Sequence, residues 1–165
     1  DSVEKRLGYP MVVKEAYGSF GAQVYLAKNR SELDALRNRL KYMPHLYQRY
    51  VKNSSGEDIR IIVVGGKAVA AMKRKNKGDF RANIELGGVG EKYIPSSEQV
   101  ELSERICRLL GADYIGVDLL FDKDKTLLCE VNTNAHFMFI SDCTGVDVAE
   151  LYIGHVMEEI YGRAD

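Results

Sequence analysis

The chain reads Tyr114-Ile-Gly-Val-Asp118-Leu-Leu-Phe121, Asp122-Lys-Asp-Lys125 and Thr126-Leu-Leu-Cys-Glu130-Val-Asn132 in one continuous stretch near its C-terminal end. Both arms are apolar and rich in residues that favour β-strands, and the polar residues between them are typical of a turn. The stretch therefore predicts a β-hairpin that turns at residues 122–125.

Two carboxylates face each other in this hairpin if the strand pairing is centred on Asp124. Asp118 then lies opposite Glu130, and Asn132 points to the same face because side chains alternate along a strand. Opposed side chains lie about 5 Å apart, where like charges repel, so the pair needs a cation or a shared proton. The oxygen ligands of Asp, Glu and Asn suit a hard cation such as Mg²⁺. A surface hairpin with solvated charges is the other interpretation, and for an acidic pair in general it is the commoner one.

Composition narrows the class of protein. The 165 residues are 45% hydrophobic and 28% charged with a net charge of −1, which fits a globular protein of one domain or two small lobes. The sequence contains no membrane-spanning run and no signal peptide. Its three cysteines have no CxxC spacing, which favours reduced thiols in a cytoplasmic protein. The chain begins without Met at what looks like the tail of an earlier element, so we expect a fragment of a longer protein.

The pattern of elements predicts an α+β fold with antiparallel sheets and helices on one side. A polar seam near residues 52–57 predicts two lobes. Ser31 to Asp34 resembles a capping box and predicts a helix start, and Ser96 to Gln99 predicts another. The expected strands are residues 11–14, 23–27, 46–51, 58–64 and 67–74 together with the two arms of the hairpin. The expected helices begin at Ser31, at Ser96 and after Asp147, and residues 133–145 are expected to be a loop.

A glycine-bearing turn between the first two strands is a candidate anion site. Gly18 and Gly21 allow backbone N–H groups to approach an anion, and Lys14 just before the turn can add a positive charge. Most glycine turns between strands are only hairpins, and the chain contains no P-loop motif.

The densest basic stretch runs from Lys73 to Arg81, and three interpretations stay open for it. It is a solvated loop, a nucleic-acid patch or a clamp for phosphate groups, and the slightly negative net charge disfavours nucleic acid. Glycines at 87, 88 and 90 then predict a flexible loop that suits a lid over an anion. A zinc set of His136, Asp142, Cys143 and His155 is also conceivable, although its spacing matches none of the usual patterns.

Taken in order, these motifs resemble one family. Asp58-Ile-Arg-Ile, the run from Val63 to Arg74, Gly78-Asp-Phe-Arg81-Ala-Asn83, Gly116-Val-Asp118 and Glu130-Val-Asn132 resemble RimK-type ligases of the ATP-grasp superfamily. These enzymes add glutamate or similar amino acids to a carboxylate. The resemblance covers nearly the whole chain and implies an ATP-grasp fold with a nucleotide bound between two lobes. Residues 1–51 would be a truncated N-terminal lobe, and residues 52–165 a C-terminal lobe with the metal site.

The resemblance also implies a role for each matching position. Ten residues would bind ATP through its phosphates, its adenine or its ribose. They are Lys14, Gly18, Gly21, Gln48, Arg49, Tyr50, Asp58, Arg81, Ala82 and Asn83. The implied catalytic residues are Arg74 and Arg81. The implied ligands of two Mg²⁺ (or Mn²⁺) ions are Asp118, Glu130 and Asn132, with Glu130 bridging.

The implied chemistry is formation of an acyl phosphate from a carboxylate and ATP, followed by attack of an amine. Nucleotide, amino acid and a small or peptidic carboxylate would be the partners; no membrane or nucleic acid is expected, and homo-oligomerisation stays open. Two departures from the family stand out. Arg49 replaces the usual Glu of the hinge, and residues 133–137 read Thr-Asn-Ala-His-Phe in place of a Ser-Pro-Gly turn. The second departure keeps open the alternative of a nucleotide-binding regulatory module without turnover.

Overall fold

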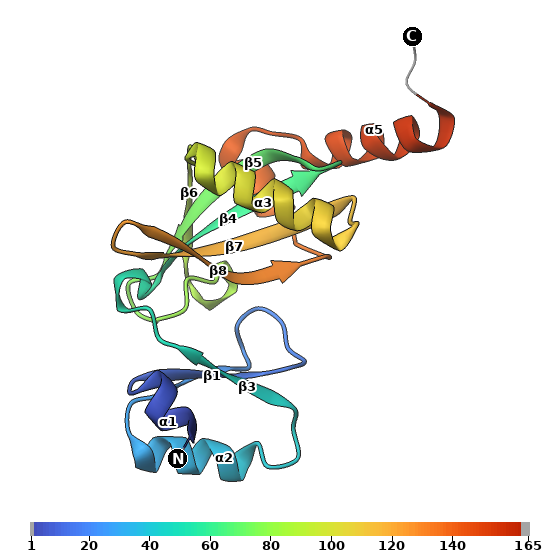
Figure 1. The fold of residues 1–165 in the computed structure, drawn as a ribbon. Helices are drawn as coiled ribbons and strands as arrows, with labels where there is room; N and C mark the ends of the chain where they lie inside the picture. The colour runs from blue at the N-terminus through green and yellow to red at the C-terminus, as the bar shows by residue number, and fades with distance from the viewer. Residues whose placement is uncertain (1, 163–165) are drawn as a thin grey trace. The chain divides into compact units, whose positions relative to one another are not determined.

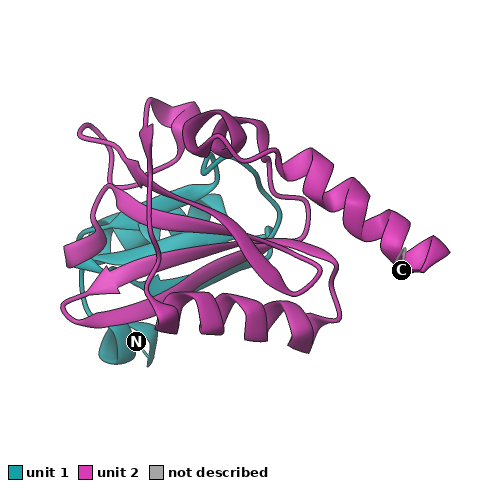
Figure 2. Ribbon diagram, turned by 90° about the horizontal axis from the view of Figure 1, so that it is seen from above, with its two compact units in different colours: residues 1–52 teal, residues 53–165 magenta. Residues whose placement is uncertain are grey.

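The structure, a computed structural model, describes residues 2–162 (Figure 1). The chain divides into two compact units, residues 1–52 and residues 53–165 (Figure 2). The boundary expected from the sequence lies between Val51 and Lys52. A short 3₁₀ helix, η1 (Lys52–Ser54), begins at this boundary.

The first unit is a three-stranded antiparallel sheet with two helices. Its elements are α1 (Ser2–Leu7), β1 (Met11–Glu15), β2 (Val24–Ala27), α2 (Arg30–Arg39) and β3 (His45–Arg49), and the strand order is β2-β1-β3. Alternation along β1 turns Met11 and Val13 to one face, where they pack with Leu33 and Leu40 around α2. Val12 and Lys14 point to the opposite face.

The N-cap of helix α2 lies two residues before the one predicted from the sequence. Asn29, not Ser31, is the N-cap, and its side chain accepts a hydrogen bond from the Glu32 backbone N–H at 3.0 Å. Glu32 accepts one in turn from the Lys28 backbone N–H at 2.9 Å. The helix begins earlier than expected because Asn29 and Glu32, three residues apart, satisfy N–H groups at the helix start.

The second unit is a five-stranded antiparallel sheet in the order β6-β5-β4-β7-β8. The strands are β4 (Glu57–Val64), β5 (Lys67–Lys75), β6 (Val89–Lys92), β7 (Tyr114–Asp122) and β8 (Lys125–Asn132). Its helices are η2 (Ile84–Leu86), α3 (Ser97–Leu110), α4 (Met138–Thr144) and α5 (Val148–Tyr161). None of the helices formed by residues 2–162 is both long and apolar enough to cross a membrane.

Several local predictions in this unit are confirmed. Gly65 and Gly66 turn the β4–β5 hairpin with φ values of 54° and 76°, which glycine adopts without strain. The capping box of Ser96 and Gln99 starts α3, and Asp147 caps α5. The loop expected over residues 133–145 is wrong in part, because residues 138–144 form α4. No side chain caps the start of α4, so the sequence carries no N-terminal signal for this helix.

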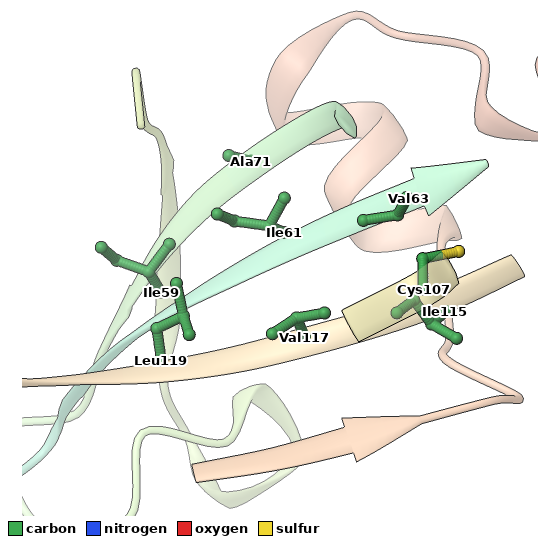
Figure 3. Close-up of a cluster of buried hydrophobic side chains, with 8 residues drawn as sticks. All are labelled: Ile59, Ile61, Val63, Ala71, Cys107, Ile115, Val117 and Leu119. Carbon is green, nitrogen blue, oxygen red and sulfur yellow. The ribbon is translucent and has the colours of Figure 1, made fainter. Parts of the chain in front are cut away.

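Each face of the second sheet has its own apolar cluster, as expected from the continuous apolar runs of β4 and β5. One cluster packs against α3, with Ile61, Val117 and Cys107 fully buried in it (Figure 3). The other cluster includes Ile62, Met72, Ile140 and Val148, and it joins the opposite face to α4 and the first residue of α5. Apolar packing therefore covers only part of that opposite face, and the remaining part is polar.

The expected pairing of Asp118 with Glu130 is confirmed, although the turn is not centred on Asp124. Asp122 pairs with Lys125, so the hairpin closes through a two-residue turn. A bulge between Asp118 and Leu119 then adds one residue on β8 and restores the predicted pairing. Without it, Glu130 would turn to the other face of the sheet.

The segment that follows β8 lies close to β7. A methyl group added at Gly116 would lie 2.5 Å from the Cβ of Ala135. The Tyr114 hydroxyl donates a hydrogen bond to the Ala135 carbonyl oxygen at 2.6 Å. Two positions of β7 therefore hold Ala135 against the face of the sheet opposite α3.

We expect Gly116→Ala to lower the free energy of unfolding by about 1–3 kcal/mol, since the new methyl group overpacks against Ala135. The double variant Gly116→Ala, Ala135→Gly should recover a large part of this loss. Gly154→Ala is the control, because nothing lies within 4 Å of its added methyl group, and it should be neutral or stabilising by up to about 1 kcal/mol. Urea denaturation measures all three. An unaltered stability of Gly116→Ala contradicts the close approach.

We expect the stability to depend on the Tyr114 hydroxyl at alkaline pH. Burial raises the pKa of Tyr114 to about 12, above the unfolded value near 10, so the fold favours the neutral phenol. This contribution is fully present below about pH 10 and is lost as the pH rises from 10 to 12. Tyr114→Phe should cost about 1 kcal/mol at pH 8 through the lost hydrogen bond.

The wild type should lose more stability between pH 9 and pH 12 than Tyr114→Phe does. Tyr42→Phe, at a residue that is 86% exposed, is the matched control. Denaturant unfolding at each pH gives the comparison, and parallel pH profiles for wild type and Tyr114→Phe would refute the assignment.

Candidate functional site

The polar part of the second sheet lies on the face opposite α3. Strand β4 supplies Asp58 and Arg60, which point to one face because they are two residues apart. In the pairing register Asp58 lies opposite Arg74 of β5, and Arg60 lies opposite Asp118 of β7. Glu130 of β8 continues the same row beyond Asp118. Four neighbouring strands thus bring charged residues together that are far apart in the sequence.

Four of these residues form one chain of ion pairs, which we call the buried ion-pair network: Asp58, Arg74, Asp118 and Arg60. Arg74 donates Nε and Nη2 to the two carboxylate oxygens of Asp58, both at 2.6 Å. The same Nη2 donates to Oδ2 of Asp118 at 2.9 Å. Arg60 donates Nε to Oδ1 of Asp118 at 2.8 Å and Nη2 to Oδ2 at 2.7 Å. Arg74 is only 3% exposed, so water screens this network poorly.

The network sets the protonation of its members. Burial works against ionisation of Asp118, but Arg74 and Arg60 outweigh it and hold the pKa of Asp118 below its ordinary value. Burial raises the pKa of Asp58, and repulsion by Asp118 adds to this effect against the pull of Arg74. Burial alone would lower the pKa of Arg74, yet the two carboxylates raise it above its ordinary value. Asp118 is therefore an ionised carboxylate and Arg74 a permanent cation at neutral pH.

The three residues expected to hold a metal meet on this face. Asp118 pairs directly with Glu130, and Gly116, two residues before Asp118, pairs with Asn132. An ionised carboxylate, a second carboxylate and an amide oxygen form the all-oxygen set that Mg²⁺ and Mn²⁺ favour, so the residues fit such an ion by their chemistry. Their role as ligands stays a prediction.

The four residues considered as an alternative zinc set do not form a metal site. Within the part of the chain that the structure describes, no three His, Cys, Asp or Glu side chains are grouped so that they could hold a metal. His155 instead contacts Asp113, with 3.0 Å between Nε2 and Oδ1. The zinc interpretation of His136, Asp142, Cys143 and His155 is therefore wrong.

The loop between β5 and β6 carries the expected phosphate-binding residues. Arg81 donates Nε and Nη2 to Asp79 at 2.9 and 2.7 Å, and this interaction holds the pKa of Asp79 below its ordinary value. Ala82 is buried, and a methyl group at Gly88 would lie 2.5 Å from its carbonyl oxygen. Asn83 directly precedes η2. The contacts of Arg81 and Ala82 fix the backbone of this segment from inside the second unit.

The expectation of a loop up to residue 90 is wrong in part. Val89–Lys92 forms β6, with Gly90 paired to Arg74. The Asn76 side chain orders the start of the segment, because it accepts from the backbone N–H groups of Gly78 and Asp79 at 2.9 and 3.1 Å. The glycines alone suggested flexibility, whereas strand pairing with β5 gives the segment regular structure.

The remaining predicted nucleotide-binding residues belong to the first unit. Lys14 and Gln48 share the face of that sheet opposite its core, because Gln48 pairs with Val12. Arg49 pairs with Met11, so it points to the other face. Gly18 lies against Gln23, whose side chain accepts from the Ser19 backbone N–H at 3.2 Å. The structure thus brings Lys14 and Gln48 to one face and separates Arg49 from them.

Gly21 and Tyr50 are the other two residues of the first unit that are predicted to bind the nucleotide. Gly21 has a φ of 73°, which glycine adopts readily, and Tyr50 follows the last residue of β3. The nucleotide-binding roles of the residues in the first unit stay predictions.

Arg60 is the site residue that the sequence reading did not assign. Its side chain is 13% exposed, and both of its ion-pair contacts are to the predicted metal ligand Asp118. The signal was present in the spacing, because Asp58 and Arg60 are two residues apart on one strand. Its partner, however, is 58 residues away and is set only by the pairing of β4 with β7.

Comparison with known proteins identifies the family. A family model described as the RimK-like ATP-grasp domain matches residues 1–156. The chain is 37% identical to beta-citrylglutamate synthase B of Danio rerio over 160 residues, which cover 95% of this chain and 40% of that protein. It is 35% identical to N-acetylaspartylglutamate synthase A of Homo sapiens, with 95% and 41% covered. A probable alpha-L-glutamate ligase of Mannheimia succiniciproducens is 34% identical, with 98% and 55% covered.

Solved structures agree on the fold. D-alanine–D-alanine ligase from Bacillus anthracis superposes on this chain with a TM-score of 0.74 at 18% identity. The match covers 96% of this chain and 58% of the ligase. The ATP-grasp ligase PsnB, complexed with its minimal precursor, Mg and ADP, has a TM-score of 0.73 at 23% identity, with 95% and 48% covered. The chain spans about two fifths of the length of the synthases from Danio rerio and Homo sapiens. By its sequence and its fold, this chain belongs to the family of RimK-like ATP-grasp domains.

Proposed function

We propose that the protein carrying this domain is an ATP- and Mg²⁺-dependent carboxylate–amine ligase. The observation that carries the proposal is the pairing of Asp118 with Glu130 beside the buried guanidinium of Arg74 and the partly buried one of Arg60. Such a face offers both the oxygen ligands of a divalent cation and the positive charge that phosphate groups require. The named relatives support it, since their names describe synthases and a ligase of glutamate compounds.

The reaction would proceed in two steps. A carboxylate oxygen of the acceptor attacks the γ-phosphorus of ATP, ADP leaves, and the product is an acyl phosphate. The amine of an amino acid then attacks the acyl carbon, phosphate leaves and the nitrogen loses a proton, which gives an amide. We propose glutamate as the amine to test first, because the names of these three relatives share it.

The residues of this chain would act by binding and by placing charge. Arg74 is fixed by Asp58 and Asp118, so its positive charge is held in place before any ligand binds. In the second unit, Arg81 and Asn83 would bind the terminal phosphates. In the first unit, the candidates for phosphate contacts are Lys14 and the backbone of Gly18 to Gly21. Gln48, Arg49, Tyr50 and Asp58 would hold the nucleoside.

Asp118, Glu130 and Asn132 would hold the metal. When bound, Mg²⁺ or Mn²⁺ would neutralise phosphate charge and polarise the phosphoryl group. No side-chain nucleophile is needed for this chemistry, because positioning and electrostatic stabilisation account for most of the catalysis of phosphoryl transfer.

A second candidate is a nucleotide-binding regulatory module without turnover. The Thr133–Phe137 segment departs in sequence from the family pattern at the place where the resemblance puts the acceptor, and Gly116 and Tyr114 contact its Ala135. To separate the two, the full-length protein is incubated with ATP, Mg²⁺, glutamate and a panel of carboxylates that includes citrate and N-acetylaspartate. ADP formation that requires both an amino acid and a carboxylate supports the ligase. Tight ATP binding without ADP formation supports the module.

We expect Glu130→Gln in the full-length protein to reduce Mg²⁺-dependent ATP turnover at least about 100-fold, because an amide cannot replace a carboxylate that neutralises a divalent cation. Circular dichroism and the melting temperature should stay close to the wild type, since Glu130 lies exposed on the edge strand β8. Glu101→Gln, an exposed carboxylate on α3, is the matched control and should leave turnover unchanged. Wild-type turnover in Glu130→Gln would disprove the metal assignment.

A further inference from the structure

Arg60 differs from the other arginine of the buried ion-pair network in how it is held. Arg74 bonds to two carboxylates, Asp58 and Asp118. Among the residues described, Arg60 bonds to Asp118 alone, through the fork of Nε and Nη2 at 2.8 and 2.7 Å. One guanidinium is therefore shared, and the other serves a single carboxylate.

We propose that Arg60 neutralises Asp118 in the metal-free domain and is the cation that a divalent metal ion displaces from this carboxylate. The proposal rests on the proposed function, which assigns Asp118 to the metal site. Until the ion arrives, Arg60 occupies one acceptor position on each oxygen of Asp118.

The charges on this face favour such an exchange. Within the buried ion-pair network, the two carboxylates of Asp58 and Asp118 balance the two guanidinium groups of Arg60 and Arg74. A divalent cation on Asp118 would leave these four side chains with an excess of positive charge. A divalent cation held by Asp118 would repel the Arg60 guanidinium, which contacts the same carboxylate. Loss of the Arg60 contact relieves this repulsion.

The hydrogen bonds that the Asp118 carboxylate accepts also indicate that Arg60 is the residue that a metal ion would displace. A carboxylate offers about four lone-pair positions. Arg60 occupies one on each oxygen, and Arg74 occupies a second one on Oδ2. The single remaining position lies on Oδ1, beside the Nε of Arg60. Departure of Arg60 opens both oxygens to a metal.

Arg74 cannot take this part. It is 3% exposed, and its departure would leave Asp58 buried without its bidentate partner. Removing one partner of a buried pair is strongly destabilising. Among residues 2–162, the only side-chain hydrogen bonds that Arg60 would lose on leaving are its two to Asp118. The network thus has one fixed arginine and one exchangeable arginine.

Metal affinity without nucleotide tests the proposal directly. Mn²⁺ binding to the full-length protein is measured by electron paramagnetic resonance of the free ion. Arg60→Gln removes the competing charge and should tighten Mn²⁺ binding about tenfold or more. Arg60→Lys keeps the charge and should bind within about threefold of the wild type. Arg108→Gln, an exposed arginine on α3, is the matched control for loss of one positive charge.

Unchanged or weaker Mn²⁺ binding in Arg60→Gln overturns the proposal, because a residue that only holds Asp118 in place would support metal binding. Glu130→Gln separates this failure from that of the proposed function. Mn²⁺ that binds Glu130→Gln as tightly as the wild type, or does not bind the wild type, contradicts the metal site and this proposal with it. Binding that is lost in Glu130→Gln but not tightened in Arg60→Gln contradicts this proposal alone.

A second measurement keeps the proposal testable if Arg60→Gln does not fold. In protein labelled with ¹⁵N-arginine, the Arg60 Nε–H signal is identified by its absence in Arg60→Lys. Titration with Mg²⁺ should shift this signal and speed its exchange with water, while the Arg74 signal stays protected. An Arg60 signal that remains unshifted when the metal site is saturated overturns the proposal.

Discussion

The buried ion-pair network of Asp58, Arg74, Asp118 and Arg60 is the interaction on which the candidate site of the second unit depends. Arg74 and Asp118 are buried and Asp58 and Arg60 partly so, and removing charges from water is costly. The attraction between them offsets this cost only where the geometry is good and the remaining donors and acceptors are satisfied. Both arginines meet a carboxylate through two parallel hydrogen bonds here, which is the strongest form of such a contact. The main effect of the network is therefore to hold the charged groups of these four residues in fixed positions, and its contribution to stability is secondary.

The two faces of the second sheet differ in character: one is apolar, and the other carries both an apolar cluster and the charged residues of the candidate site. The face under α3 is a dry cluster with Ile61 and Val117 fully buried. The opposite face is apolar only beneath α4 and the start of α5, and it becomes charged along the same strands. A rigid antiparallel sheet then holds the charged residues, because strands positioned by a packed core keep their register. The segment after β8 packs against this face at Gly116 and Tyr114, so its position depends on β7, the strand that also carries Asp118.

Much of the fold and of the candidate site could be predicted because the relevant signals are local. Alternation, turn glycines and capping residues indicated the β4–β5 hairpin, the β7–β8 hairpin and the start of α3. Helix α4 was missed because no side chain caps its first turn. Strand β6 was missed because its glycines suggest a loop, whereas pairing with β5 gives it structure. The nucleotide-binding roles of Lys14, Gln48 and their neighbours come from family resemblance and remain predictions.

The sequence by itself determined that Glu130 and Asn132 share one face of a strand, since a two-residue period does not depend on the rest of the chain. That Asp118 lies on the same face depends on the bulge in β8, which only the structure revealed. It also determined the family, through motifs that occur in a fixed order. Only the tertiary structure decided which cations neutralise Asp118. Arg60 and Arg74 lie 58 and 44 residues away from it in the chain, and only the pairing of β4 with β5 and β7 brings them within hydrogen-bonding distance. Charge neutralisation is a property of the three-dimensional neighbourhood, and spacing along the chain does not encode it.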